Sequence, residues 1–157
     1  RGPSTCKALM GSTSSRRGPS GGVDGSRDAN DPVSPAQILV VEDDDDLREL
    51  FVQLVGAFLN RRCVAVGSYE ELVAMGDEAL KCRGAILDIN LGPSRRSGID
   101  AYAWLRQKGY AGRIAFLTGH ASNHPFVVEA NRLGNAEIFT KPIDPEQMRT
   151  LVDGRPQ

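Results

Sequence analysis

This sequence predicts a doubly wound α/β fold, in which helices cover both faces of a parallel five-stranded sheet. From Ala36 onward, short aliphatic runs alternate with longer segments of helical period, which is the pattern of successive β-α units. Several of the helical segments are bounded by capping residues, proline or glycine. A chain of 157 residues with 40% hydrophobic and 25% charged residues also suits one globular domain plus some extra chain.

Five aliphatic runs are the expected strands, and their unbroken apolar character indicates a sheet that is buried on both faces. They comprise residues 38–41, 63–66, 85–87, 114–117 and 136–139. Helical segments separate them, so the expected order is (βα)5. Right-handed crossovers place helices on both faces of such a sheet, and polar residues at the carboxyl ends of the strands then converge on one crevice.

The first helix is expected between the first two strands. Its apolar residues recur at the i, i+3, i+4, i+7 spacing of an amphipathic helix. They are Leu47, Leu50, Phe51, Leu54, Val55, Phe58 and Leu59. Asp44, Asp45 and Asp46 precede them, at positions where carboxylates cap free N–H groups and complement the helix dipole. We therefore expect these three acids to stabilise the helix rather than bind a metal.

The second helix is predicted to start near Ser68. This serine is an N-cap with Glu71 three residues later, which is the spacing of a capping box. The inner face of the helix is expected to carry Tyr69, Leu72 and Val73.

Three further helices complete the expected order. The third covers about residues 97–108 and the fourth about residues 125–133, and a glycine follows each of them. The fifth has Asp144 as its N-cap and Pro145 at its first position, where proline lacks only an N–H group that would be free in any case.

Residues 1–35 are rich in glycine, serine, proline and arginine, and show neither a helical nor an alternating apolar pattern. Such a composition cannot bury enough surface to offset the entropy of ordering, so we expect a disordered linker or a tag-like remnant. A functional basic tail around Arg16 and Arg17 is the alternative. The folded domain is expected over residues 36–153, with residues 154–157 as a C-terminal tail.

Charge and composition argue against several classes of function. The formal net charge is -1, from 19 basic and 20 acidic residues, and gives no overall field for binding nucleic acid or an anionic membrane. No apolar segment approaches the ~20 residues of a membrane span, and no signal-peptide core is visible, so a cytoplasmic location is expected. Cys6, Cys63 and Cys82 are odd in number and lack C-x-x-C spacing, which favours buried thiols over a disulfide or a zinc site.

The ends of the expected strands carry polar residues. Glu42 and Asp43 follow the first strand, Asp88 closes the third, Thr118 closes the fourth and Lys141 follows the fifth. The three acids would repel one another at close quarters unless a cation lies between them. Because all the ligands are oxygens, a hard cation is expected, Mg²⁺ with Mn²⁺ as an alternative.

Four motifs, "ILVVEDD", "AILDINL", "IAFLTG" and "IFTKP", occur in this order. Together they resemble the receiver domain of two-component response regulators, over residues 36–153. The resemblance implies a flavodoxin-like fold with strand order 2-1-3-4-5. It also implies a signalling module rather than an enzyme. Such a module catalyses only its own phosphorylation from a donor and its own dephosphorylation. The implied partners are a histidine kinase or a histidine phosphotransfer protein, and an unidentified downstream protein.

The resemblance assigns a role to each residue at the strand ends. Asp88 is similar to the aspartate that accepts the phosphoryl group. Asp43 and Asp88 would ligate Mg²⁺ directly, Glu42 directly or through water, and the backbone carbonyl of Asn90 would complete the protein ligands. The side chains that would bind the phosphoryl oxygens are those of Thr118 and Lys141.

Two secondary positions lie beside the expected phosphoryl site. Gly119 leaves the entrance open, and His120 stands where residues of this family influence the rate of dephosphorylation. His124, in the same loop, is expected to tune access or face solvent.

The chain departs from the family's pattern at two places. Gly92 stands where proline is usual, and the loop after it carries Arg95 and Arg96, so a longer and basic loop is expected at the rim of the site. Ile138 stands where Tyr or Phe is usual, so the aromatic switch of the family is not expected here.

The sequence argues against two other classes of protein. A flavin-binding electron carrier of the same fold would need a phosphate loop where the acids of residues 42–46 stand, and these acids would repel the phosphate. A phosphatase of the haloacid dehalogenase type needs a second aspartate two residues after the nucleophile, where this chain has Asn90. Within the receiver reading, a stand-alone regulator and the terminal receiver of a hybrid kinase both remain open.

Overall fold

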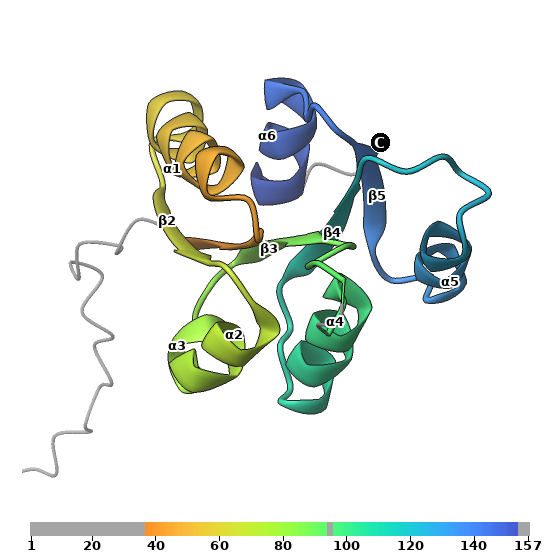
Figure 1. Cartoon of the computed structure of the whole chain (residues 1–157). Coiled ribbons are helices and arrows are strands. Elements are labelled where there is room, and N and C mark those ends of the chain that lie inside the picture. The colour runs from red at the N-terminus through yellow and green to blue at the C-terminus, as the bar shows by residue number, and fades with distance from the viewer. Residues whose placement is uncertain (1–36, 94–95, 154–157) are drawn as a thin grey trace, which may run out of the picture. The chain divides into compact units, whose positions relative to one another are not determined.

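The structure is a computed structural model that describes residues 37–93 and 96–153. The expected linker (1–35), the C-terminal tail (154–157) and Arg95 lie outside the described residues. Five strands and six helices follow one another in this order: β1 (Gln37–Val41), α1 (Asp45–Leu59), β2 (Arg62–Val66), α2 (Tyr69–Met75), α3 (Asp77–Leu80), β3 (Gly84–Asp88), α4 (Gly98–Gln107), β4 (Arg113–Thr118), α5 (Pro125–Arg132), β5 (Glu137–Thr140) and α6 (Pro145–Asp153) (Figure 1).

All five strands are parallel and pair in the order β2-β1-β3-β4-β5. Strand β1 pairs on both sides, with Leu39 opposite Val64 of β2 and opposite Ala85 of β3. This arrangement confirms the doubly wound fold and the 2-1-3-4-5 strand order that the sequence predicts. The chain reverses its winding direction between β1 and β3, so the crevice outside these two strand ends is the expected site.

The core has two layers because side chains alternate between the faces of a strand. In β1, Ile38 and Val40 pack on the face that α1 and α6 cover, whereas Leu39 and Val41 pack on the opposite face under α2, α4 and α5. Figure 1 shows α1 and α6 together on one side of the sheet. Burial of both faces explains why the strands read as unbroken aliphatic runs.

The predicted helix caps are present. The side chain of Asp44 accepts a hydrogen bond from the N–H of Leu47 at 3.0 Å, and that of Ser68 accepts one from Glu71 at 3.2 Å. In α6, the carboxylate of Asp144 accepts from the N–H of Glu146 at 2.7 Å. Asp44 is the N-cap of α1 and stands two residues after Glu42. This cap therefore fixes the point at which the chain passes from β1 into α1, and with it the position of Glu42 and Asp43 between the two elements.

The second helical segment differs from the prediction. Gly76, at a φ of 56°, ends α2, and the short helix α3 follows it, so two helices stand where one was expected. A positive φ favours glycine and interrupts the helix. Val73 was expected on the inner face and is 38% exposed, whereas Leu72 is fully buried.

One strand boundary also differs from the prediction. The fifth strand begins at Glu137 rather than at residue 136, because the turn through Gly134 still occupies the preceding residues. In α1, Phe51 and Val55 are buried, but Leu50 and Phe58 are 47% and 53% exposed. A helix buries one stripe against a sheet, and the seven apolar positions predicted for α1 span more than that stripe. None of the described helices combines the length and apolar character needed to cross a membrane.

Candidate functional site

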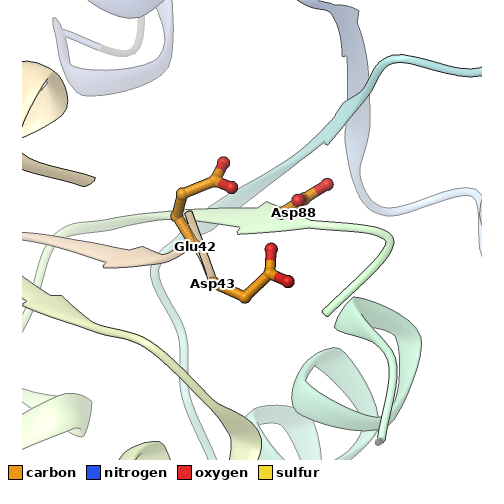
Figure 2. A group of neighbouring side chains, drawn as sticks. All are labelled: Glu42, Asp43 and Asp88. Carbon is orange, nitrogen blue, oxygen red and sulfur yellow. The ribbon is translucent and has the colours of Figure 1, made fainter. Parts of the chain in front are cut away.

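Glu42, Asp43 and Asp88 lie together at the carboxyl ends of β1 and β3. Glu42 directly follows β1, and Asp88 is the last residue of β3. One carboxylate oxygen from each of the three residues lies within 4.8 Å of the others. Figure 2 shows their carboxylates around one small region beside the strand ends. Parallel strands that are neighbours in the sheet bring these acids to one place although 45 residues separate Asp43 from Asp88 along the chain.

Lys141 reaches this acidic cluster from the end of β5. Its Nζ donates hydrogen bonds to Oδ2 of Asp88 at 3.0 Å and to Oε1 of Glu42 at 3.2 Å. The two acids are almost fully buried, at 5% and 1% exposure, whereas Asp43 is exposed. The ammonium therefore offsets part of a negative charge that water does not screen.

Burial changes the acid–base properties of this cluster. The pKa of Glu42 is raised to about 7, chiefly because burial removes its hydration; the hydrogen bond from Lys141 opposes this rise, and the neighbouring charge of Asp88 adds to it. For Lys141, burial works to lower the pKa, but the hydrogen bonds to Glu42 and Asp88 prevail and raise it. Lys141 is therefore a fixed positive charge at neutral pH.

The cluster fits a hard divalent cation. Oε2 of Glu42 is buried and 2.9 Å from Nζ of Lys141, yet it accepts no hydrogen bond from any described residue. Lys141 brings one positive charge to the two buried carboxylates of Glu42 and Asp88, so a further cation would balance the negative charge that remains. One carboxylate oxygen from each of Glu42, Asp43 and Asp88 together forms an all-oxygen donor set of the kind that Mg²⁺ prefers.

A cavity of about 400 Å³ opens over the cluster. The lining residues are Glu42, Asp43, Asp44, Leu47, Asp88, Asn90, Gly119, His120 and Lys141. Asn90 lies beside the phosphoacceptor candidate, because its N–H donates to Oδ1 of Asp88 at 3.2 Å. A side chain at Gly119 would meet no atom within 4 Å, so the cavity is open on that side.

Thr118 ends β4 next to the cavity but does not line it. Its side chain is 1% exposed, and its Oγ1 accepts a hydrogen bond from the N–H of His120 at 2.9 Å. The imidazole of His120 stacks on that of His124, with ring centroids 4.1 Å apart and an interplanar angle of 12°. His124 is also the N-cap of α5, since its Nδ1 accepts from the N–H of Phe126 at 3.4 Å. A chain of contacts thus joins Thr118 to the first turn of α5.

Ile138 and Arg96 do not reach the cavity. Ile138 pairs with Phe116 in the sheet and packs against the core cluster below α5. Arg96 lies 3.5 Å from the carboxylate of Asp100, and its guanidinium lies 5.2 Å from the ring centroid of Tyr69. Arg96 is therefore held between α2 and α4.

Sequence reasoning overlooked Arg48 and the capping role of His124. Nη1 of Arg48 donates to the backbone carbonyl of Glu42 at 2.8 Å and to that of Asp43 at 3.5 Å. A long side chain one turn into a helix carries no sequence signal for a contact with the preceding loop. Histidine is not among the preferred N-cap residues, so only Pro125 at the first helical position indicated where α5 begins.

Comparison with known protein families gives a match that covers most of the chain. The chain matches a family model described as the response regulator receiver domain over residues 38–153. That range contains both acidic strand ends and Lys141. No curated protein matches the chain.

Solved structures of several receiver domains are similar to this chain. The signal receiver domain of a protein described as a Luxo repressor from Vibrio parahaemolyticus has 26% sequence identity and a TM-score of 0.63, covering 76% of this chain and 88% of that chain. A CheY-like receiver domain protein from Methanospirillum hungatei JF-1 has 21% identity and a TM-score of 0.65, covering 77% and 93%. The receiver domain of NtrX from Brucella abortus has 24% identity and a TM-score of 0.63, covering 74% and 95%.

Proposed function

Because the chain belongs to the response regulator receiver domain family, we propose that Asp88 accepts a phosphoryl group from a phosphorylated histidine of a partner protein. One observation carries the proposal. The carboxylate of Asp88 lies at the open end of β3 between two further acids and the ammonium of Lys141, 3.0 Å away. This arrangement provides a nucleophile, an all-oxygen metal site and a fixed positive charge within one cavity.

The metal site would use the side chains of Glu42, Asp43 and Asp88 together with the backbone carbonyl of Asn90. Bound Mg²⁺, or Mn²⁺ in its place, supplies positive charge that offsets the repulsion between the incoming anion and these acids. Among the described residues, the cavity lining contains one ammonium, that of Lys141, so the negative charge of the three acids and a phosphoryl group exceeds the positive charge of this lining.

The transfer itself is a substitution at phosphorus. An oxygen of Asp88 attacks, a P–O bond of an acyl phosphate forms, and the P–N bond to the donor imidazole breaks, with the electron pair leaving on nitrogen. Lys141 now binds Oδ2 of Asp88, and its ammonium can follow the negative charge onto a phosphoryl oxygen. Its burial against Glu42 holds it near the reacting atoms.

Thr118 would change its hydrogen-bond partner in the phosphorylated state. Its hydroxyl is held by the N–H of His120 and would turn to a phosphoryl oxygen, which releases the backbone of the loop after β4. The contacts that join this loop to α5 support a switch in which phosphorylation alters the α5 surface and thereby the binding of a downstream protein. The same chemistry serves a stand-alone regulator and a receiver within a hybrid kinase.

Labelling with a small phosphodonor tests the proposal. Acetyl phosphate with Mg²⁺ is expected to add one phosphoryl group to the chain, and peptide mapping should locate it at Asp88. Asp88→Asn should remain unlabelled, since an amide is a poor nucleophile, and a chelator should suppress the reaction of the wild-type chain. Equal labelling of Asp88→Asn, or labelling that is indifferent to the chelator, contradicts the assignment.

A further inference from the structure

Arg48 contacts the segment that carries two of the acids without lining the cavity. It lies in the first turns of α1, and its side chain is one quarter exposed. Nη1 donates to the carbonyls of Glu42 and Asp43, while Nη2 forms an ion pair with Asp45. One guanidinium therefore connects the start of α1 to the backbone of both acids.

The backbone at Glu42 and Asp43 needs such a partner because it is leaving the sheet. The N–H of Glu42 still donates to Val66 of β2, at 3.0 Å, and the next residues turn away toward α1. A carbonyl beyond the last strand pair has no ladder donor, and leaving it unpaired next to a buried carboxylate is unfavourable. Arg48 supplies donors to these carbonyls and thereby limits the directions in which the side chains of Glu42 and Asp43 can point.

Gly67 provides the space that the guanidinium fills. A Cβ atom at this position would lie 2.9 Å from Nη1 and 3.3 Å from Cζ of Arg48. The nearest atoms all belong to the mobile end of the arginine, so a methyl group here would displace the guanidinium at little cost to the fold. Two independent observations thus place the guanidinium of Arg48 here. One is the missing side chain of Gly67 after β2, and the other is the set of hydrogen bonds to the loop after β1.

We propose that Arg48 is a positioning residue for the metal site, which holds the backbone of Glu42 and Asp43 so that their carboxylates face Asp88; this inference rests on the proposed function. Charge alone predicts the opposite effect. A guanidinium near the acids repels a cation, so removal of its charge would tighten Mg²⁺ binding. If Arg48 acts through geometry, its removal weakens Mg²⁺ binding, because outer partners that orient ligands commonly contribute about 10-fold or more to metal affinity.

The test measures Mg²⁺ binding to the unphosphorylated full chain by isothermal titration calorimetry. Arg48→Gln removes the charge and the fork of donors, and Gly67→Ala keeps the charge but displaces the guanidinium. Both variants should weaken Mg²⁺ binding by roughly 10-fold. In labelling with acetyl phosphate, the half-saturating Mg²⁺ concentration should rise, and the rate at saturating Mg²⁺ should stay within about twofold of the wild type.

Two further variants separate the carbonyl bonds from the surface ion pair. Asp45→Asn removes the ion pair alone, and the Mg²⁺ affinity should remain that of the wild type. Arg48→Lys keeps the charge and one donor, so its loss of affinity should be smaller than that of Arg48→Gln. Thermal unfolding of each variant, followed by circular dichroism, reports whether the fold is retained.

Each other outcome overturns the inference. Tighter or unchanged Mg²⁺ binding in Arg48→Gln, with no effect of Gly67→Ala, would show that the guanidinium acts only by charge or not at all. A lower melting temperature with unaltered Mg²⁺ affinity would reduce Arg48 to a structural contact. If Arg48→Gln did not fold, the affinity of Gly67→Ala alone decides. A wild-type chain that bound no Mg²⁺ would instead refute the proposed function, and the positioning role with it.

Discussion

At the scale of single residues, the buried carboxyl of Glu42 dominates the electrostatics of the site. It shares the ammonium of Lys141 with Asp88 and is 1% exposed. An acid in this position is more easily protonated in the folded chain than in the unfolded chain, because unfolding returns it to water. Burial of the ionised carboxylate destabilises the fold, and the size of this destabilisation therefore depends on pH.

The pH dependence of stability is the first residue-scale prediction. The pKa of Glu42 is raised from 4.5 to about 7 by burial, so the folded state holds a proton that the unfolded state has lost between these values. The free energy of unfolding should then fall as the pH rises from 4.5 to about 7, by at most about 3 kcal/mol from this group. The stabilisation by the bound proton is fully present below the lower value and absent above the higher one.

Glu42→Gln tests this dependence by removing the titrating group and keeping its shape. Urea unfolding of both proteins without Mg²⁺, at several pH values from 4.5 to 8, should show a smaller decline in the variant. The variant should thus gain stability relative to the wild type as the pH rises. Parallel curves for the two proteins would mean that Glu42 titrates at its ordinary pKa.

Lys141 carries the second residue-scale prediction. Lys141→Ala removes the only cationic side chain that lines the cavity over the described residues, and the rate of labelling by acetyl phosphate should fall on the order of 100-fold. The fold should persist, since protonation of Glu42 can relieve the uncompensated charge. Lys81→Ala is the matched control, because this exposed lysine pairs with Glu78 on α3, does not line the cavity, and should leave the rate unaltered. Equal rates for the two variants would remove Lys141 from the site.

At the scale of elements, the loop between β4 and α5 connects the site to the surface. Thr118, His120 and His124 form a continuous set of contacts from the last residue of β4 to the first turn of α5. By contrast, Ile138 of β5 is β-branched and stiff, and it cannot reproduce the swing of an aromatic ring. We expect the structural response to phosphorylation in the loop and α5 rather than in β5.

Hydrogen exchange with the phosphoryl mimic beryllofluoride and Mg²⁺ tests this expectation. Protection should change most over residues 119–133, because Thr118 gives up the N–H of His120 when it binds the mimic. Such a shift requires only that the mimic binds one of two pre-existing conformations of the chain more tightly than the other. Asp88→Asn, which lacks the acceptor, should show no such change. A response confined to β5 and α6 would contradict this route.

At the scale of the whole molecule, sheet order decides which distant residues meet. Lys141 contacts Glu42 across 99 residues of sequence and Asp88 across 53. These contacts arise because β1, β3, β4 and β5 are successive neighbours and all end at the same edge. The two faces of the sheet are sealed by helices, so this edge is where polar groups can gather without entering the core.

Much of this arrangement could be predicted from local pattern. The five aliphatic runs locate the strands to within one or two residues, and the caps at Asp44, Ser68 and Asp144 locate three helix starts. Composition and spacing also identified the acids at the ends of β1 and β3. These features depend on backbone hydrogen bonding and on alternation within a segment, which are physical properties of neighbouring residues in the chain.

The sequence by itself thus determined the order of elements, the two-faced core and the residue types at the strand ends. Only the tertiary structure decided which apolar residues of α1 are buried, that Gly76 divides the second helical segment, and that Gly67 leaves room for Arg48. It also decided that His120 and His124 stack. Each of these facts depends on the space left by an element elsewhere in the chain, and periodicity along one segment contains no information about that space.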